Sequence, residues 1–150
     1  MESVAAQVLA ALRERGASIA CAESLTGGGL AAELTAVPGA SASVRGGVVT
    51  YATEVKRELL GVTAELVVSA ACAEQMAQGV RALLAATWGI STTGVAGPDT
   101  QDGQPVGTVF VGLAGPEGVR AQRLRLSGDR DEIRAATVAA ALTTLLGALG

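Results

Sequence analysis

The chain has no histidine, and this absence excludes several kinds of active site. Without an imidazole, neither a Ser-His-Asp triad nor a histidine-based metal site can be built from this chain alone. The two cysteines, Cys21 and Cys72, are not spaced as a metal pair. We expect both to be small buried side chains rather than disulfide partners. The sequence therefore predicts a site without a metal ion, and it indicates no cofactor.

Aromatic residues are almost as scarce, since only Tyr51, Trp88 and Phe110 occur in 150 residues. Because 49% of the residues are hydrophobic, the core must be built from alanine, valine, leucine and isoleucine. A chain of this length can bury a sizeable core. We therefore expect a single domain over residues 1–150.

Strong charge and membrane signals are also lacking. The net charge is −3 and no block of like charges occurs, which argues against nucleic-acid binding. We find no apolar run that approaches the length of a bilayer span, and Met1-Glu2-Ser3 does not resemble a secretory signal. These features predict a cytoplasmic protein with no membrane partner.

The periodicity of apolar residues predicts alternating helices and strands. Helices are predicted over residues 3–15, 30–34, 54–61, 69–83 and 129–149. Strands are predicted over residues 18–21, 44–53, 106–114 and 119–126, with another that starts at Gly89 and runs into a polar loop ending at Gln104. The strand over 119–126 breaks its alternation at Gln122 and Arg123, which indicates either a bulge or an edge strand with a polar face. The fold class is α/β, a three-layer α/β/α sandwich around a mixed, mostly parallel sheet.

The most distinctive stretch is Ala22–Leu30, in which a predicted strand meets a helix through three glycines. Glycine lets the backbone bend sharply or approach a ligand closely. A helix N-terminus carries unpaired N–H groups that suit a phosphate or an oxyanion. The alternative is an ordinary glycine-rich turn in which Ser24 or Thr26 caps the helix.

Three strand ends are followed by small or hydroxyl residues, at 23–28, 50–56 and 93–98. Ligands of open α/β sheets bind at such ends, so Ser24, Tyr51 and Lys56 could face one cleft. Serine paired with lysine performs nucleophilic catalysis without histidine. As a base near neutral pH, Lys56 would need its pKa lowered by about 3 units, or about 4 kcal/mol. Otherwise it is a surface lysine near Glu58.

Two more candidates have alternatives of their own. Tyr51 is either a core residue whose hydroxyl finds a partner or a group that contacts Ser24, Lys56 or the substrate. Arg130, near the start of the last helix, either binds an anion or is solvated, and its position favours solvation. Lys56 is the only lysine among eleven basic residues, which is a mild indication that its amine has a task.

Several segments carry a resemblance that spacing alone does not reveal. They are AESLTGG at 22–28, VPGAS at 37–41, GGVVTY at 46–51, VK at 55–56 with LGV at 60–62, TGVAGP at 93–98, PVGTV at 105–109 and GDR at 128–130. In this order and over nearly the whole chain, they closely resemble the CinA C-terminal domain family. The larger CinA proteins carry a further N-terminal domain, and this chain resembles the stand-alone form.

The resemblance implies an α/β/α fold, homo-oligomeric assembly and nicotinamide-nucleotide amidase activity, in which nicotinamide mononucleotide and water give nicotinate mononucleotide and ammonia. It also implies a Ser-Lys site at Ser24 and Lys56 with Tyr51 nearby. The remaining residues expected to bind the substrate are the N–H groups around Thr26, Gly27 and Gly28 for the oxyanion, the loop residues Gly94, Ala96 and Gly97 for the nucleotide, and Arg130 for its phosphate. Two alternatives remain: a nucleotide-binding regulatory module without turnover, and hydrolysis of another amide or a phosphoester.

Overall fold

Residues 2–150, which the computed structural model describes, form five strands and five α-helices. The strands are β1 (Ile19–Glu23), β2 (Val44–Val49), β3 (Trp88–Gly94), β4 (Thr108–Gly115) and β5 (Gly118–Arg125). The helices are α1 (Val4–Glu14), α2 (Gly29–Thr35), α3 (Thr53–Leu60), α4 (Ala70–Leu83) and α5 (Arg130–Leu149), with a 3-10 turn at Ala40–Ala42. The elements predicted from periodicity are all present, with bounds that differ by a few residues.

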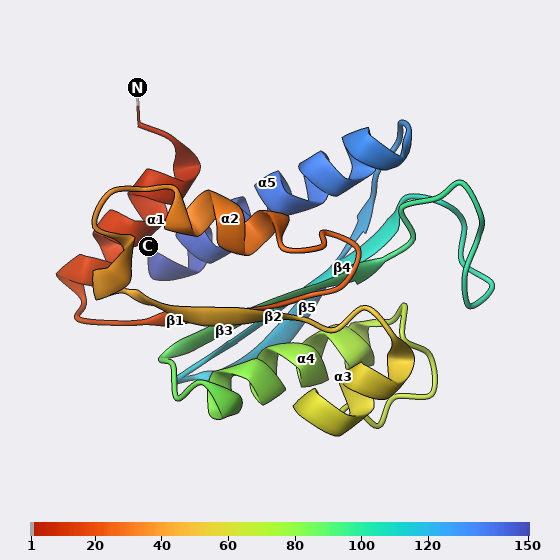
Figure 1. Cartoon of the computed structure of the whole chain (residues 1–150), viewed down its shortest axis with the longest axis horizontal. Helices are drawn as coiled ribbons and strands as arrows, with labels where there is room; N and C mark the ends of the chain where they lie inside the picture. Colours follow the sequence, from red (N-terminus) through yellow and green to blue (C-terminus); the bar gives the residue numbers. More distant parts are fainter. Residues whose placement is uncertain (1) are drawn as a thin grey trace.

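The strands make one mixed sheet in the order β2-β1-β3-β4-β5. Strands β2, β1 and β3 are parallel, and β4 and β5 continue the sheet in antiparallel pairing. Helices α1, α2 and α5 cover one face, and α3 and α4 cover the other (Figure 1). The predicted three-layer α/β/α sandwich is therefore confirmed.

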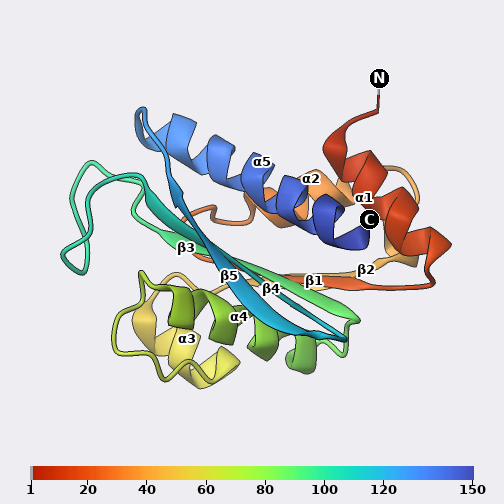
Figure 2. The ribbon, with the colours of Figure 1, turned by 180° about the vertical axis from the view of Figure 1, so that it is seen from behind.

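Strand β1 is the point at which the chain changes direction across the sheet. From β1 the chain passes through α2 to β2 on one side, and from β2 it returns through α3 and α4 to β3 on the other side. The view from behind shows α2 and the α3–α4 pair on opposite faces (Figure 2). Ligands of open α/β sheets bind at such a switch point, outside the carboxyl ends of the strands.

The strand with broken alternation is an edge strand without a bulge. All eight residues of β5 pair in regular register with β4, from Thr108 opposite Arg125 to Gly115 opposite Gly118. Most of its side chains are exposed. Arginines on an exposed edge discourage pairing with another sheet, and this explains the polar face that the sequence showed at Gln122 and Arg123.

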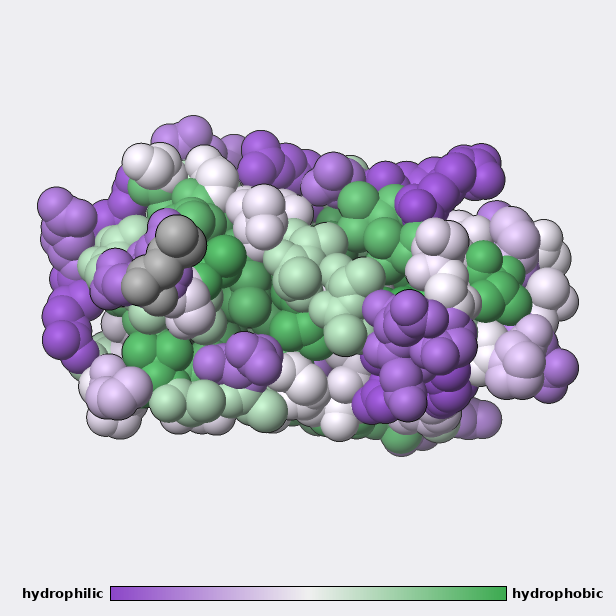
Figure 3. All heavy atoms as spheres, turned by 90° about the horizontal axis from the view of Figure 1, so that it is seen from above, coloured by the Kyte–Doolittle hydropathy of each residue, from purple (hydrophilic) through white to green (hydrophobic). Residues whose placement is uncertain are grey.

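Helix α5 corrects one sequence prediction, because its 20 residues are long and apolar enough to cross a membrane by length and composition. The core helix of a globular domain meets the same criteria, and here Ile133, Leu142 and Leu145 are buried against the rest of the chain. A groove between α1, α2 and α5 is lined in part by Val4 and Val138. Apolar residues are visible on this face of the molecule (Figure 3).

Glycines let α4 pack directly on the sheet. A Cβ at Gly89 of β3 would overlap the carbonyl oxygen of Ala77, and a Cβ at Gly112 of β4 would overlap that of Ala73. The hydroxyl of Ser91 donates to the same Ala73 carbonyl at 2.6 Å. Helix α4 therefore rests on the backbone of the central strands, with no room for another carbon atom.

We expect Gly112→Ala to lower the free energy of unfolding by about 2–3 kcal/mol, because α4 must move away from the sheet. Urea denaturation would measure this change. The matched control is Gly147→Ala on α5, where an added Cβ meets nothing within 4 Å. That control should be neutral or gain up to about 1 kcal/mol from helix propensity. Equal stability of the two variants would contradict the close packing of α4.

Candidate active site

The register of the parallel strands brings two loops together. Glu23, the last residue of β1, pairs with Val49, the last residue of β2. Beyond this pair the amide of Thr50 donates to the carbonyl of Glu23 at 2.8 Å. The residues that follow, Ser24 after β1 and Tyr51 after β2, therefore leave the sheet side by side.

Helix α3 starts directly after this point and turns Lys56 back toward the strand ends. The Nζ atom of Lys56 lies 2.9 Å from Ser24 Oγ. It also donates to the carbonyl oxygens of Thr50 at 2.7 Å and Tyr51 at 3.0 Å. Only 2% of the Lys56 side chain is exposed, so the alternative of a surface lysine near Glu58 is wrong.

The three partners of Lys56 Nζ fit both a neutral amine and an ammonium ion. Backbone carbonyls only accept hydrogen bonds, so Thr50 and Tyr51 take two N–H groups of the amine. The third position faces Ser24, whose hydroxyl can donate to the lone pair of a neutral amine or accept from an ammonium ion. The amine can therefore exchange a proton with Ser24 while both carbonyl bonds stay in place.

Burial lowers the pKa of Lys56 below its ordinary value of 10.5, because the charged form loses water. Negative charge on Cys72 or Asp102 would act in the opposite direction. Burial, however, raises the pKa of the Cys72 thiol to about 11. The thiol is therefore uncharged at neutral pH, and burial remains the largest influence on the pKa of Lys56.

The glycine-rich turn is built around Glu23, whose side chain is fully buried. Its carboxylate accepts from the hydroxyl of Thr26 at 2.6 Å. The same carboxylate accepts from the backbone amides of Gly28 at 3.2 Å, Leu30 at 2.9 Å and Ala31 at 2.9 Å. A carboxylate that satisfies the first amides of a helix also interacts favourably with the helix dipole.

This network corrects two expectations. The N-cap of α2 is Gly28, with φ of 103°, so neither Ser24 nor Thr26 caps the helix. The amide of Gly27 donates to the Ser24 carbonyl at 3.1 Å and that of Gly28 to Glu23. Both N–H groups have acceptors within the turn and are not free to bind an oxyanion, whereas the amide of Thr26 has no acceptor among residues 2–150.

Two further side chains hold the turn from other elements. The hydroxyl of Thr92, buried in β3, lies 2.8 Å from that of Thr26 and accepts from the amide of Ser24 at 3.4 Å. From α5, Arg134 donates to the carbonyl of Leu25 at 2.9 Å. Ser24 is therefore positioned by the sheet, by α2 and by α5 together.

Ser24 and Lys56 line a cavity of about 420 Å³ at the carboxyl ends of the parallel strands. Seven of the residues predicted from sequence to form the site line it: Ser24, Tyr51, Lys56, Gly94, Ala96, Gly97 and Arg130. Thr26, Gly27 and Gly28 do not, because they lie behind Ser24 in the turn that Glu23 organises. No group of three or more histidine, cysteine, aspartate or glutamate side chains that could hold a metal occurs within residues 2–150.

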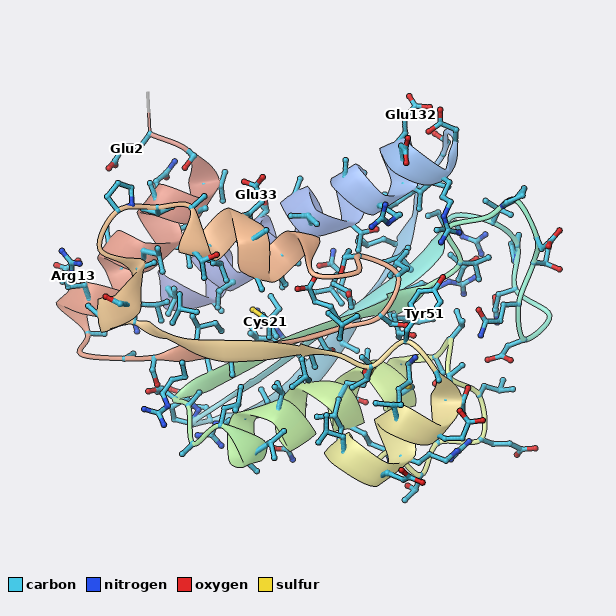
Figure 4. All side chains as sticks on the ribbon, in the orientation of Figure 1. Glu2, Arg13, Cys21, Glu33, Tyr51 and Glu132 are labelled. Carbon is cyan, nitrogen blue, oxygen red and sulfur yellow. The ribbon has the colours of Figure 1, made fainter. Side chains whose placement is uncertain are left out.

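Tyr51 and Arg130 meet at the rim of the cavity. The Tyr51 side chain is 61% exposed, which excludes the alternative of a core tyrosine. Its hydroxyl accepts from Arg130 at 3.1 Å, and a second N–H group of Arg130 donates to the carbonyl of Gly97 at 2.7 Å. The side chain of Tyr51 lies beside the ends of the strands (Figure 4), and the long side chain of Arg130 reaches it from the start of α5. Arg130 is thus hydrogen-bonded at the rim rather than merely solvated.

Comparison with known proteins assigns this arrangement to a family, since the CinA C-terminal domain matches residues 1–149. The chain belongs to the CinA C-terminal domain family. It is 53% identical over 146 residues to a CinA-like protein of Frankia casuarinae, which covers 94% of this chain and 34% of the relative. It is 52% identical over 132 residues to a putative competence-damage inducible protein of a Geobacillus species, and the match covers 84% of this chain and 32% of that relative. The chain thus spans about a third of the length of these relatives.

Solved structures of the CinA superfamily share the fold over nearly their whole length. The superfamily protein from Klebsiella pneumoniae 700603 is 37% identical with a TM-score of 0.93, covering 97% of this chain and 95% of that one. The competence or damage-inducible protein from Enterobacter asburiae is 29% identical with a TM-score of 0.94, and the match covers 98% of this chain and 96% of that one. The fold of this CinA domain is therefore the fold of the family.

Sequence reasoning on the CinA domain missed several residues that shape the site. Glu23 and Thr92 had no assigned role, and Arg134 was not considered. The signal for Glu23 was available, because a carboxylate that ends a fully buried strand must find donors nearby. Arg134 left no such signal, since its partner at Leu25 is more than a hundred residues away in the sequence.

Glu23→Ala should lower the free energy of unfolding by about 3 kcal/mol, because it leaves two buried and two partly buried donors without their acceptor. Urea denaturation of the variant beside the parent protein measures the change. Glu33→Gln, an exposed change on the same helix α2, is the matched control and should stay within about 0.5 kcal/mol. If the two variants were equally stable, Glu23 would not organise the turn.

Proposed function

We propose that this CinA domain hydrolyses the carboxamide of nicotinamide mononucleotide, giving nicotinate mononucleotide and ammonia. The names of its relatives identify the family and do not state this activity. The proposal is supported by the resemblance of the sequence and, above all, by one contact. That contact is the 2.9 Å approach of a buried lysine amine to a serine hydroxyl at the wall of a cavity.

In the first half of the proposed reaction, Ser24 Oγ attacks the carboxamide carbon and its proton passes to Lys56 Nζ. The two carbonyl partners of Lys56 keep the resulting ammonium ion in place. The ammonium then returns the proton to the nitrogen that leaves as ammonia. The product of this half is an ester between Ser24 and the nicotinoyl group.

In the second half, water attacks the ester carbon and Lys56 accepts a proton from the water. The carbon–oxygen bond to Ser24 breaks, and Lys56 gives the proton back to Ser24 Oγ. The products are the nicotinate carboxyl group and the original enzyme. Lys56 thus acts as base and acid in turn. This is possible because the hydrogen-bonding position of Nζ that faces Ser24 can either accept or give a proton.

For the oxyanion we propose the amide of Leu25, the residue that follows the nucleophile. Leu25 lines the cavity, and within residues 2–150 its N–H group has no hydrogen-bond partner. Each such donor contributes a few kcal/mol, about 3, to stabilising the transition state. Gly94, Ala96 and Gly97 would hold the nucleotide, and Arg130 would bind its phosphate with Tyr51 beside it.

The proposal includes homo-oligomeric assembly, as the resemblance implies, together with the cytoplasmic location and the lack of a cofactor that the composition predicts. Large apolar side chains are exposed at the end of the edge strand β2 and on α3, among them Val49, Val55 and Leu59. Val55 and Leu59 lie one helical turn apart on α3. Such a surface is consistent with an interface between copies.

Ser24→Ala should reduce ammonia release from nicotinamide mononucleotide by about a thousandfold or more, because the covalent step is lost. A coupled ammonia assay measures it. Lys56→Arg should be as inactive, since a guanidinium cannot be deprotonated in proteins. Ser41→Ala and Arg57→Lys, at exposed positions, are the matched controls. Activity of Ser24→Ala within tenfold of the parent protein would refute the mechanism.

A measurement of nucleotide affinity, made beside the ammonia assay, separates the alternatives. Tight binding of the nucleotide without ammonia release by the parent protein would favour a regulatory nucleotide-binding module. Turnover of another amide or of a phosphoester, in a panel run with and without chelator, would redirect the proposal to that substrate.

The activity should rise with pH, because Lys56 must be neutral to accept the proton from Ser24. Below the pKa of Lys56 the amine is an ammonium ion and kcat/KM is low, and above it kcat/KM reaches a plateau. Burial holds that pKa below 10.5, so the acid limb should lie below the range of a free lysine. A profile of kcat/KM against pH that is flat, or that rises only where free lysine titrates, would exclude Lys56 as the base.

A further inference from the structure

The polar loop after β3 is a tight hairpin. The backbones of Gln101 and Gln104 are hydrogen-bonded to each other, and the strongest of these bonds is 2.8 Å long. Between them Asp102 and Gly103 both have positive φ, 53° and 71°. Asp-Gly with positive φ at both positions is typical of a two-residue hairpin turn. We call residues 98–104 the cavity hairpin, and it projects beyond the end of the sheet (Figure 2).

Asp102, at the tip of the cavity hairpin, reaches across to another segment. Its Oδ2 atom accepts from the amide of Val67 at 2.9 Å and from that of Val68 at 3.1 Å. Val67 and Val68 lie between α3 and α4 and are buried. Through these two bonds a single side chain joins two segments that are over thirty residues apart.

Both joined segments are walls of the same cavity. Val67 and Val68 line one side, and Asp99, Thr100 and Gln101 of the cavity hairpin line another. The sheet holds the first wall as well, because the hydroxyl of Thr93 donates to the carbonyl of Val67 at 2.6 Å. The cavity hairpin is linked to that wall by the hydrogen bonds that Asp102 accepts from Val67 and Val68.

We propose that Asp102 is a positioning residue for substrate binding, which closes the cavity by tying the cavity hairpin to the Val67–Val68 segment. The inference rests on the proposed function of the same site and names a determinant of its affinity for the nucleotide. Asp102 does not line the cavity and takes no part in bond making. Its loss should therefore weaken binding and leave the chemical step intact at a pH where Lys56 is already neutral, although the lost negative charge also shifts the pKa of Lys56 downward.

Two substitutions separate the acceptor from the turn. Asp102→Gly keeps a residue that adopts positive φ freely and removes the acceptor. Asp102→Asn keeps an acceptor oxygen and also tolerates positive φ. Glu117→Gly serves as the control, because it removes an exposed carboxylate from the β4–β5 turn, away from the cavity. The Asn variant should resemble the parent protein if the acceptor oxygen, rather than the charge, maintains the tie.

Hydrogen exchange of the Val67 and Val68 amides tests the tie without substrate. In Asp102→Gly these two amides should exchange about tenfold faster or more, because they lose their acceptor. Asp102→Asn and Glu117→Gly should leave them protected. Unchanged exchange in Asp102→Gly overturns the proposal.

Calorimetric titration with nicotinamide mononucleotide, together with the ammonia assay, tests the consequence. On the alkaline plateau of the pH profile, where Lys56 is neutral in every variant, we expect Asp102→Gly to raise Kd and KM about tenfold, with kcat within about twofold, and Asp102→Asn to restore affinity. Faster exchange with unchanged affinity would overturn the proposal, because the tie would then serve only the fold. Faster exchange with weaker binding supports it even if the parent protein releases no ammonia, in which case only the chemistry proposed for Ser24 and Lys56 fails.

Discussion

The amine of Lys56 is removed from water and held by two backbone carbonyls, and the rest of the site follows from this constraint. A buried ammonium ion is costly, and a buried amine with unpaired N–H groups is also unfavourable. The carbonyls of Thr50 and Tyr51 satisfy two N–H groups and leave a single direction open, toward Ser24. These carbonyls can face inward only because β2 has ended and α3 has begun. The chemistry of Lys56 thus depends on where a strand stops.

At the end of β1 a second constraint arises, because the first amides of helix α2 need hydrogen-bond acceptors. A helix N-terminus at the switch point of an α/β sheet is a common binding site for anions. Here the chain's own carboxylate, that of Glu23, takes the amides of Gly28, Leu30 and Ala31. The helix terminus therefore stabilises the turn that carries Ser24, and an anionic ligand must be bound elsewhere in the cavity. In the proposed function that role falls to Arg130 at the rim.

The sequence predicted the fold well because the features that determine it are local. Apolar periodicity indicated the helices, and glycine- or proline-containing turns indicated their ends. The convergence of Ser24, Tyr51 and Lys56 on one cavity followed from a general rule on parallel strands. The direction of side chains did not follow from it: Tyr51 approaches Lys56 through its carbonyl, and its hydroxyl points to Arg130. Which amides were free also could not be predicted, because Glu23 accepts from residues on the next helix.

Side chains position this site mainly by binding the backbone rather than one another. Glu23 binds amides of α2, Lys56 binds carbonyls after β2, and Asp102 binds amides before α4. Backbone groups keep their places only while the strands keep their register. A shift of β2 against β1 by one residue would move the carbonyls away from Lys56 and would also separate Ser24 from the amine. The register of β1 with β2 is therefore as much a part of the candidate site as the serine and the lysine, because it fixes both the carbonyls that hold Lys56 and the position of Ser24.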